Sequence, residues 1–290
     1  MYDQIISDLE DLKIRGAENV LKWGVFAFSM KIKDVESKCS FISTFLKVLN
    51  DSKKEILALR PNQIALNNAL DYIFIKKRYS GFSSLSEIKE DVSERLNTIE
   101  DRLKYLNFKI SQIGSKKIKS NMQVYTHGHS SFVENIFEDT LKTINFSVLY
   151  SDSKDLVPSF VKILSKNLPT LVYPFNMVDS IISNSDLILL GSSAVNKDGF
   201  LCEVGTSAIV NLAQVHGVPV YVVSDLLKYS ADYKFKLSVD INVGVKLPSK
   251  VKYLSNDFDL VDADLFDGII CEEGIISWIE FKHLAKNNFN

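Results

Sequence analysis

Cysteine is scarce in this sequence, and its three residues, Cys39, Cys202 and Cys271, lie far apart along the chain. They are too few and too scattered for a disulfide framework or a thiolate metal cluster. The simple interpretation is a protein of the reducing cytoplasm. The N-terminal stretch, Met1 to Glu10, carries three acidic side chains and no apolar run, which is unlike a secretory signal peptide.

Long apolar runs and an excess of one charge are also missing. The longest apolar stretches, such as Val218 to Val223, are far shorter than a membrane span. The 34 basic and 36 acidic residues are interspersed and give a formal net charge of −2. A protein that binds mainly nucleic-acid phosphates would show a basic excess. We therefore expect neither a membrane nor direct nucleic acid as a partner.

The first 119 residues show helical periodicity. Apolar residues recur at helical spacing near residues 5–12 and 41–49, and again in a long charged segment, Leu85 to Leu106. Pro61 is expected to open a further helix that runs through Ile73, because proline suits the first helical position. No clear strand interrupts this part, so residues 1–119 are predicted to form a helical domain.

After residue 119, short apolar runs alternate with amphipathic segments. Six strands are predicted, at Met122–Tyr125, Phe146–Tyr150, Thr170–Tyr173, Leu187–Leu190, Val218–Val223 and Gly268–Cys271. The helices predicted between them include Phe132–Leu141, Pro158–Leu164 and Thr206–Val215. Apolar strands that are each followed by a helix imply a parallel sheet covered on both faces. The predicted fold is thus α/β: a helical domain, then a Rossmann-like open parallel sheet domain over residues 120–290.

In such sheets, ligands bind beyond the carboxyl ends of the strands, at a topological switch point. One loop at a strand end runs from Thr126 through His127, His129 and Ser130 into a helix. Backbone amides at such a helix start can hold an anion. The two histidines could instead belong to a metal site, but no third ligand is evident. Helix capping and loop packing are the alternative roles for these residues.

A second loop begins at Gly191 and includes Ser192 and Ser193, and Gly205 with Thr206 opens the next predicted helix. Together these residues could form a phosphate cradle, although neither stretch is a Walker loop or a dinucleotide fingerprint. Glycines also end strands for purely steric reasons, so both interpretations stay open.

Three basic side chains stand at junctions between predicted elements: Arg15, which precedes Gly16 and Ala17, then Arg60, and Lys228 after a strand. An arginine there can bind a phosphate through two hydrogen bonds, or it can pair with a surface carboxylate. The sequence contains no CxxC motif and no serine nucleophile elbow. The residues alone leave the function open, and they predict no metal and no cofactor.

Taken in order, these loops resemble a known family. It contains the α, β and δ subunits of eukaryotic initiation factor 2B, their archaeal homologues, ribose 1,5-bisphosphate isomerase and methylthioribose-1-phosphate isomerase. The resemblance runs nearly from end to end and rests on these segments: Arg15–Ala17 (RGA), Leu59–Pro61 with Asn67–Leu70 (RPT…NAL), Thr126–His127 (THCN), Gly191, Gly199 and Gly205–Thr206 (GAD…NG…NKIGT), Val218–Val222 with Lys228, and Asp257–Asp259 with Ile269–Ile275.

The resemblance implies a mechanism from which this sequence departs. The isomerases are understood to use a cysteine of the THCN loop and an aspartate of the GAD segment for proton transfer, and the matching residues are Gly128 and Ser193. Glycine has no side chain, and serine is a poor acid or base without an activating partner. Glu203 matches a phosphate-contacting lysine but has the opposite charge. We therefore predict no catalytic residue, and we expect Cys202 to be a small buried side chain.

The leading hypothesis is a non-catalytic regulatory or scaffold subunit like those of initiation factor 2B, which binds a sugar phosphate or a nucleotide. The resemblance implies a homodimer through the sheet domain or a heteromer with paralogues, and it allows initiation factor 2 as a partner. A second hypothesis is a sugar-phosphate isomerase, in which Arg15, Arg60 and Lys228 bind phosphate and His127 or His129 moves protons. A third is a fold without ligand that acts only within a heteromeric complex.

Overall fold

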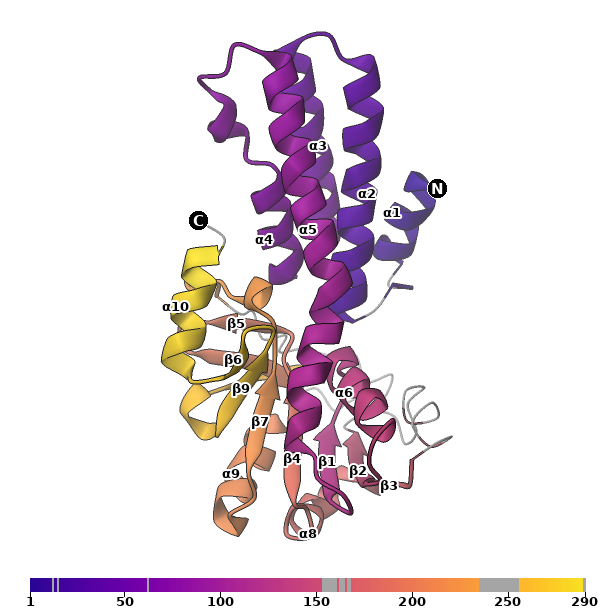
Figure 1. The fold of residues 1–290 in the computed structure, drawn as a ribbon, viewed down its shortest axis with the longest axis vertical. Coiled ribbons are helices and arrows are strands. Elements are labelled where there is room, and N and C mark those ends of the chain that lie inside the picture. Colours follow the sequence, from indigo (N-terminus) through magenta and orange to yellow (C-terminus); the bar gives the residue numbers. More distant parts are fainter. Residues whose placement is uncertain are drawn as a thin grey trace, which may run out of the picture. The chain divides into compact units, whose positions relative to one another are not determined.

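The structure is a computed structural model that describes residues 1–11, 13–14, 16–61, 63–152, 161, 165, 168–234 and 256–288 (Figure 1). The chain divides into two compact units. The helical unit consists of residues 1–109, 225–229 and 280–290, and the sheet unit of residues 110–224 and 230–279. The domain boundary near residue 119 stays a prediction. No helix in the described ranges combines the length and the apolar composition that crossing a membrane requires.

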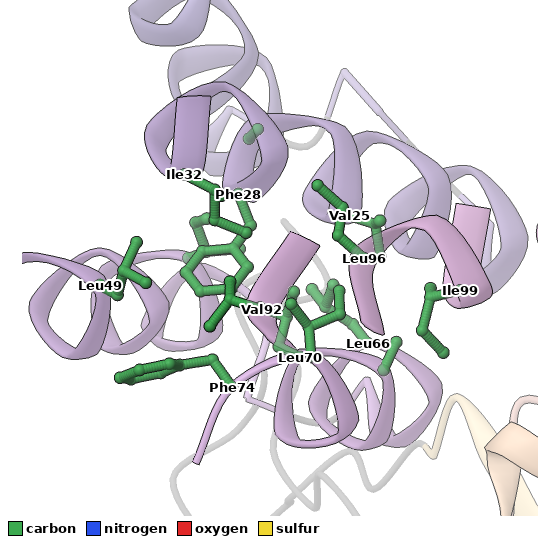
Figure 2. Close-up of a cluster of buried hydrophobic side chains, with 14 of the residues drawn as sticks. Val25, Phe28, Ile32, Leu49, Leu66, Leu70, Phe74, Val92, Leu96 and Ile99 are labelled. Carbon is green, nitrogen blue, oxygen red and sulfur yellow. The ribbon is translucent and has the colours of Figure 1, made fainter. Parts of the chain in front are cut away.

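The helical unit has the core that the periodicity predicts. Its elements are α1 (Tyr2–Glu10), α2 (Ala17–Lys38), α3 (Ile42–Leu59), α4 (Ile64–Ile73), η1 (Lys76–Tyr79), most of α5 (Leu85–Gly114), η4 (Leu226–Lys228) and most of α10 (Trp278–Asn288). Side chains of α2 to α5 point toward a common centre (Figure 2). Val92, Leu96 and Ile99 on α5 recur every three or four residues and are at least 96% buried, so one face of this charged helix lies in the core.

The interpretation of Pro61 as the first residue of a helix was wrong. Helix α4 begins at Ile64, and Pro61 precedes it. The amide of Gln63 donates a hydrogen bond to the carbonyl oxygen of Arg60 at 3.1 Å, which makes Pro61 the second residue of a turn. The fixed φ of proline suits that turn position as well as it suits a helix start, so local sequence did not distinguish the two.

The sheet unit contains the predicted parallel sheet. Its strands are β1 (Gln123–His127), β2 (Ser147–Asp152), β3 (Thr170–Pro174), β4 (Leu187–Gly191), β7 (Val220–Val223), β9 (Gly268–Cys271) and β10 (Gly274–Ile276). They lie in the order β10-β9-β7-β4-β1-β2-β3, and only β10 is antiparallel to its neighbour. All six predicted strands are present, and the strand order reverses between β1 and β4. That pair is the topological switch point.

The helices and turns of this unit are η2 (Ser115–Lys117), α6 (Ser131–Leu141), η3 (Phe175–Met177), α8 (Val178–Ile182), α9 (Thr206–His216) and η5 (Ala263–Leu265). Helix α6 begins after Ser130, whose hydroxyl accepts a hydrogen bond from the amide of Val133, and it buries an apolar face. The helix predicted at Pro158–Leu164 lies almost wholly outside the described residues.

A second, antiparallel sheet was not predicted. It consists of β5 (Ala194–Asn196), β6 (Gly199–Glu203) and β8 (Phe258–Val261), in the order β5-β6-β8. The sequence interpretation treated residues 191–204 as one loop, whereas most of them form the β5–β6 hairpin. Asp198-Gly199 between two apolar stretches is a hairpin signal that could have revealed it. This small sheet places Glu203 and Asp259 beside the predicted site.

Candidate ligand-binding site

The loops that follow β1 and β4 meet at the switch point, the position where ligands bind in open parallel sheets. A Cβ added at Gly191, the last residue of β4, would lie 2.3 Å from the Cβ of Ser130, the cap of α6. Glycine is required there because any side chain would collide with the neighbouring loop. The structure thus brings Ser130 together with the loop that contains Ser192 and Ser193.

Thr126 and His127, the last residues of β1, are buried and hold the strands together. The Nε2 of His127 lies 2.8 Å from the carbonyl oxygen of Val204, and Nδ1 lies 3.0 Å from the hydroxyl of Ser151 and 2.9 Å from its carbonyl oxygen. The Tyr125 hydroxyl is hydrogen-bonded to the same Ser151 hydroxyl. Both ring nitrogens of His127 therefore have internal partners, which fits loop packing better than proton transfer.

His129, two residues further on, is the exposed histidine of this loop. Its side chain is 45% exposed, and Nε2 lies 3.3 Å from a carboxylate oxygen of Glu134 on α6. A histidine beside a carboxylate can exchange protons with a bound molecule if that molecule reaches it. His129 is thus the stronger acid–base candidate of the two predicted histidines.

Gly128 lies directly against Glu203. Its φ is +66°, in the left-handed region, and a Cβ there would lie 2.8 Å from Cγ and 3.0 Å from Cβ of Glu203. Gly128, which the resemblance matches to the isomerases' cysteine, has no side chain, and the glutamate at the end of β6 fills the space in front of it. A cysteine could not be restored at Gly128 unless Glu203 moved.

The serines after β4 are held by local hydrogen bonds. The Ser192 hydroxyl donates to the hydroxyl of Ser224 at 2.8 Å, and both residues are buried. Ser193, which the resemblance matches to the isomerases' aspartate, is half-buried, and its amide donates to the carbonyl oxygen of Leu201 at 2.7 Å. Cys202 on β6 is fully buried, as expected for a packing residue.

The N-terminus of α9 is already occupied by a carboxylate. Oδ2 of Asp259, on β8, accepts hydrogen bonds from the amides of Gly205 at 2.9 Å and Ser207 at 3.0 Å. The Thr206 hydroxyl donates to the carbonyl oxygen of Glu203 at 2.7 Å. Amides at a helix start attract anions, and here an internal anion satisfies two of them. The cradle predicted from Gly205 and Thr206 is thus lined by the protein's own charge.

A second group of predicted residues lies in the helical unit. Helix α2 begins right after Gly16, without a side-chain cap, so Ala17 is its first residue. The Arg60 guanidinium donates a hydrogen bond to the carbonyl oxygen of Ile14 at 3.0 Å, which places Arg60 beside that helix start. Arg15 lies outside the described residues.

Lys228 is buried beside Asp225, a residue that the sequence reasoning missed. The Lys228 Nζ lies 3.6 Å from Oδ2 of Asp225, and their side chains are 6% and 1% exposed. Burial raises the pKa of Asp225, while the charges of Lys228 and Arg102 act in the opposite direction. The negative charge of Glu18 on α2 also raises the pKa of Asp225. Asp225 therefore lies close to the start of α2 within this unit.

Asn68 on α4 fixes this segment. Its Nδ2 donates to the carbonyl oxygens of Leu227 at 2.7 Å and Tyr229 at 2.8 Å, on either side of Lys228. Asn68 and Asp259 both lie in segments that carried the family resemblance, but nothing in a single sequence shows which distant backbone group each side chain meets. Among the described residues, no group of three or more histidines, cysteines or acidic residues is placed to hold a metal ion.

These features define an α/β protein in which a helical unit accompanies a doubly wound, mostly parallel sheet with closely packed loops at its switch point. Residues 13–278 match the Initiation factor 2 subunit family. The chain belongs to this family, as the order of its loop motifs predicted.

The relatives include both enzymes and initiation-factor subunits. Ribose 1,5-bisphosphate isomerase of Pyrococcus furiosus is 20% identical over 94% of this chain and 89% of its own length. The structure of translation initiation factor eIF-2B from Pyrococcus horikoshii matches with a TM-score of 0.76 at 18% identity, over 96% of this chain and 98% of that one. A chain of the tetrameric eIF2B-beta2-delta2 complex from Chaetomium thermophilum matches with a TM-score of 0.76 at 16% identity, over 99% and 93%. At these identities the structural matches show the fold alone.

Proposed function

We propose that this protein is a non-catalytic member of its family, which binds a phosphorylated sugar or nucleotide and acts as a regulatory or scaffold subunit. The observation that carries this proposal is the contact between Gly128 and Glu203. At the position where the isomerases are understood to hold a cysteine, the chain has no side chain, and a carboxylate fills the adjacent space. A negative charge there also disfavours a phosphate or a developing enolate oxygen.

The other groups near the switch point support the same conclusion. Ser193 replaces an aspartate, and loss of one positioned proton-transfer group costs about 10²–10⁴-fold in rate. His127 is 3% exposed, with internal partners at both ring nitrogens. Asp259 takes two of the amides that a phosphate would use. A ligand bound at this edge would thus find few groups able to move its protons.

Phosphate binding rests on the helical unit in this proposal. The uncapped start of the 22-residue helix α2 carries a partial positive charge, and the Arg60 side chain lies beside it. Lys228 contributes less than a free lysine would, because Asp225 offsets its charge at 3.6 Å. The expected binding is therefore weaker than that of a site with three uncompensated cations.

Thermal unfolding tests this binding. A ligand at about 100 times its Kd stabilises the native state by about 2.7 kcal/mol, so ribose 1,5-bisphosphate, methylthioribose 1-phosphate or a nucleotide should raise Tm. Arg60→Met should abolish the shift. Arg95→Met is the matched control, because Arg95 pairs with Asp91 at 2.9 Å on α5 and contacts none of the predicted site residues that the structure describes. No shift with any of these compounds would instead support a protein that acts without a ligand.

We further propose that the chain associates with itself or with paralogues. The Chaetomium thermophilum relative is a subunit of a heteromeric tetramer, and this chain matches 93% of that subunit. Light scattering at micromolar concentration should give the mass of a dimer or a larger assembly. A monomer at that concentration would contradict self-association and leave only the heteromeric partner.

A sugar-phosphate isomerase is the second candidate. The name of the Pyrococcus furiosus relative favours it, and by relatedness alone it has at least as much support as the non-catalytic proposal. His129 is the residue available for proton transfer in that case, because its side chain is exposed and paired with Glu134. Turnover of ribose 1,5-bisphosphate that disappears in His129→Ala would establish this candidate.

A further inference from the structure

A cavity of about 500 Å³ lies between α2 and α5 in the helical unit. Small-molecule sites typically have volumes of roughly 300–1,000 Å³. None of the described predicted site residues lines it, although Glu18, whose charge acts on Asp225, does. Its walls are largely apolar and include Trp23, Phe26 and Leu103.

Two aromatic rings form one wall of the cavity. Trp23 and Phe26 lie one turn apart on α2, and each is 39% exposed. Their ring centroids are 5.9 Å apart in an edge-to-face arrangement. The face of a tryptophan ring attracts cations, by about 0.5–1 kcal/mol at exposed sites and more where water is excluded.

The polar part of the wall offers acceptors. Glu18 on α2 and Asn107 on α5 are hydrogen-bonded to each other through Asn107 Nδ2 and Glu18 Oε1. Glu18 Oε2 and Asn107 Oδ1 are buried and have no hydrogen-bond partner in the part of the chain that the structure describes. A buried acceptor without a donor is unfavourable, so a hydrogen-bond donor of a bound molecule would stabilise both atoms.

The charges around the cavity favour a cation. The Lys104 ammonium lies 2.8 Å from a carboxylate oxygen of Asp101, outside the cavity wall, which compensates its charge. Glu100 and Lys22, the other charged lining residues, offset each other in sign. Glu18 is the acidic residue of the wall whose carboxylate keeps one oxygen without a hydrogen-bond partner among the described residues.

We propose that this cavity binds a small organic cation, an amine or guanidinium group on an apolar body. The cationic head donates to Glu18 Oε2 and Asn107 Oδ1, and the apolar body lies against Trp23 and Phe26. Both oxygens are buried in the free protein, so binding requires the Glu18 and Asn107 side chains to rotate toward the cavity that they line. The ligand thus has hydrogen-bond donors at one end and an apolar surface at the other. These features distinguish it from the phosphorylated ligands proposed above.

Three compounds of similar shape test the charge preference: phenethylamine as the cation, phenethyl alcohol as its neutral analogue, and 3-phenylpropionate as the anion. Binding is followed by the fluorescence of Trp23 in a Trp278→Phe background, since the chain has two tryptophans. We expect the amine to bind at least about tenfold more tightly than the alcohol, a difference of about 1.4 kcal/mol. The anion should not bind.

Two variants test whether Glu18 causes the preference for the amine over the alcohol. Glu18→Gln keeps the size of the side chain but removes its charge, so the amine and the alcohol should then bind alike. Glu100→Gln, the matched control on the same cavity, should retain the preference for the amine. Calorimetry with Trp23→Ala should show weaker binding of both compounds, because that variant removes the aromatic wall.

Circular dichroism confirms that each variant is folded. Equal affinity of the wild type for amine and alcohol would overturn the proposal, and so would tighter binding of the anion. Absence of amine binding at millimolar concentration would overturn it as well, and so would an unchanged amine preference in Glu18→Gln. The phosphate-dependent thermal shift uses a different ligand and different residues, so either proposal can fail without the other.

Discussion

Gly128 and Gly217 have nearly the same φ, so a comparison of the two measures how much the contact with Glu203 adds to the cost of a side chain at position 128. Gly128 has φ +66° and faces Glu203, whereas Gly217, after α9, has φ +67° and open space around it. Gly217→Ala should cost roughly 1–2 kcal/mol, because left-handed conformations disfavour a Cβ. Gly128→Ala should cost about 1–3 kcal/mol more, because its methyl group also collides with a packed side chain. Urea denaturation measures both free energies of unfolding.

The excess cost at position 128 should depend on residue 203. In a Glu203→Ala background most of this excess cost should disappear, since the Cγ atom at 2.8 Å is gone and only the contact with Cβ at 3.0 Å remains. Equal costs of the two glycine substitutions in the wild-type background would show that Glu203 leaves the space at Gly128 open.

The buried Asp225 carboxyl predicts a pH dependence of stability. Burial raises its pKa in the native state, so the native state binds this proton more tightly than the unfolded state does. The stabilisation is complete below the ordinary aspartate pKa and is lost as pH rises through the raised value. Asp225→Asn lacks this loss. The free energy of unfolding of the variant, relative to that of the wild type, should therefore increase with rising pH, by at most about 1.4 kcal/mol per pH unit.

The measurement is the free energy of unfolding of both proteins between about pH 4 and pH 8, the range above the ordinary aspartate pKa. The comparison is repeated in a Lys228→Met background, because a buried lysine that has lost its carboxylate partner releases its proton more readily and would add a slope of the same sign. A difference that stays constant across this range would mean that Asp225 has an ordinary pKa in the folded protein.

At the scale of elements, the Asn68 side chain hydrogen-bonds α4 to the 225–229 segment. Asn68→Ala removes two hydrogen bonds, to Leu227 and Tyr229, and should cost about 1–3 kcal/mol because each contributes about 0.5–1.5 kcal/mol net. Asn67→Ala is the matched control: Asn67 is exposed and bonds Asp71 at 3.2 Å, so its loss should cost less than about 0.5 kcal/mol. Chemical denaturation measures the free energy of unfolding of both variants. Similar losses in the two would contradict the role of Asn68 in holding this segment.

The elements also show what the sequence could predict. Six parallel strands, including Leu187–Leu190 and Gly268–Cys271, were predicted because strands buried on both faces are apolar throughout. Strands β5, β6, β8 and β10 were missed. They have three to five residues each and lie outside the main alternation of strands and helices. So few residues do not show a recognisable pattern of apolar and polar side chains.

At the scale of the whole molecule, the sequence predicted which loops share an edge of the sheet better than it predicted what those loops contact. The Thr126 and Gly191 loops both follow strands of the predicted parallel sheet. Because the carboxyl ends of parallel strands share one edge, the sequence predicted that both loops lie at that edge. The partners of those loops could not be predicted. Asp259 meets the start of α9 from more than 50 positions away, and Asn68 meets Tyr229 from 161 positions away. Such pairs depend on tertiary packing, which no local pattern encodes.

The central claim is that this family fold lacks the means of proton transfer at its switch point. Conversion of ribose 1,5-bisphosphate to the ketose, followed by ³¹P NMR with the wild-type protein at high concentration, tests it most directly. The account predicts a rate equal to that without protein. Turnover by the wild type that His129→Ala abolishes would contradict it.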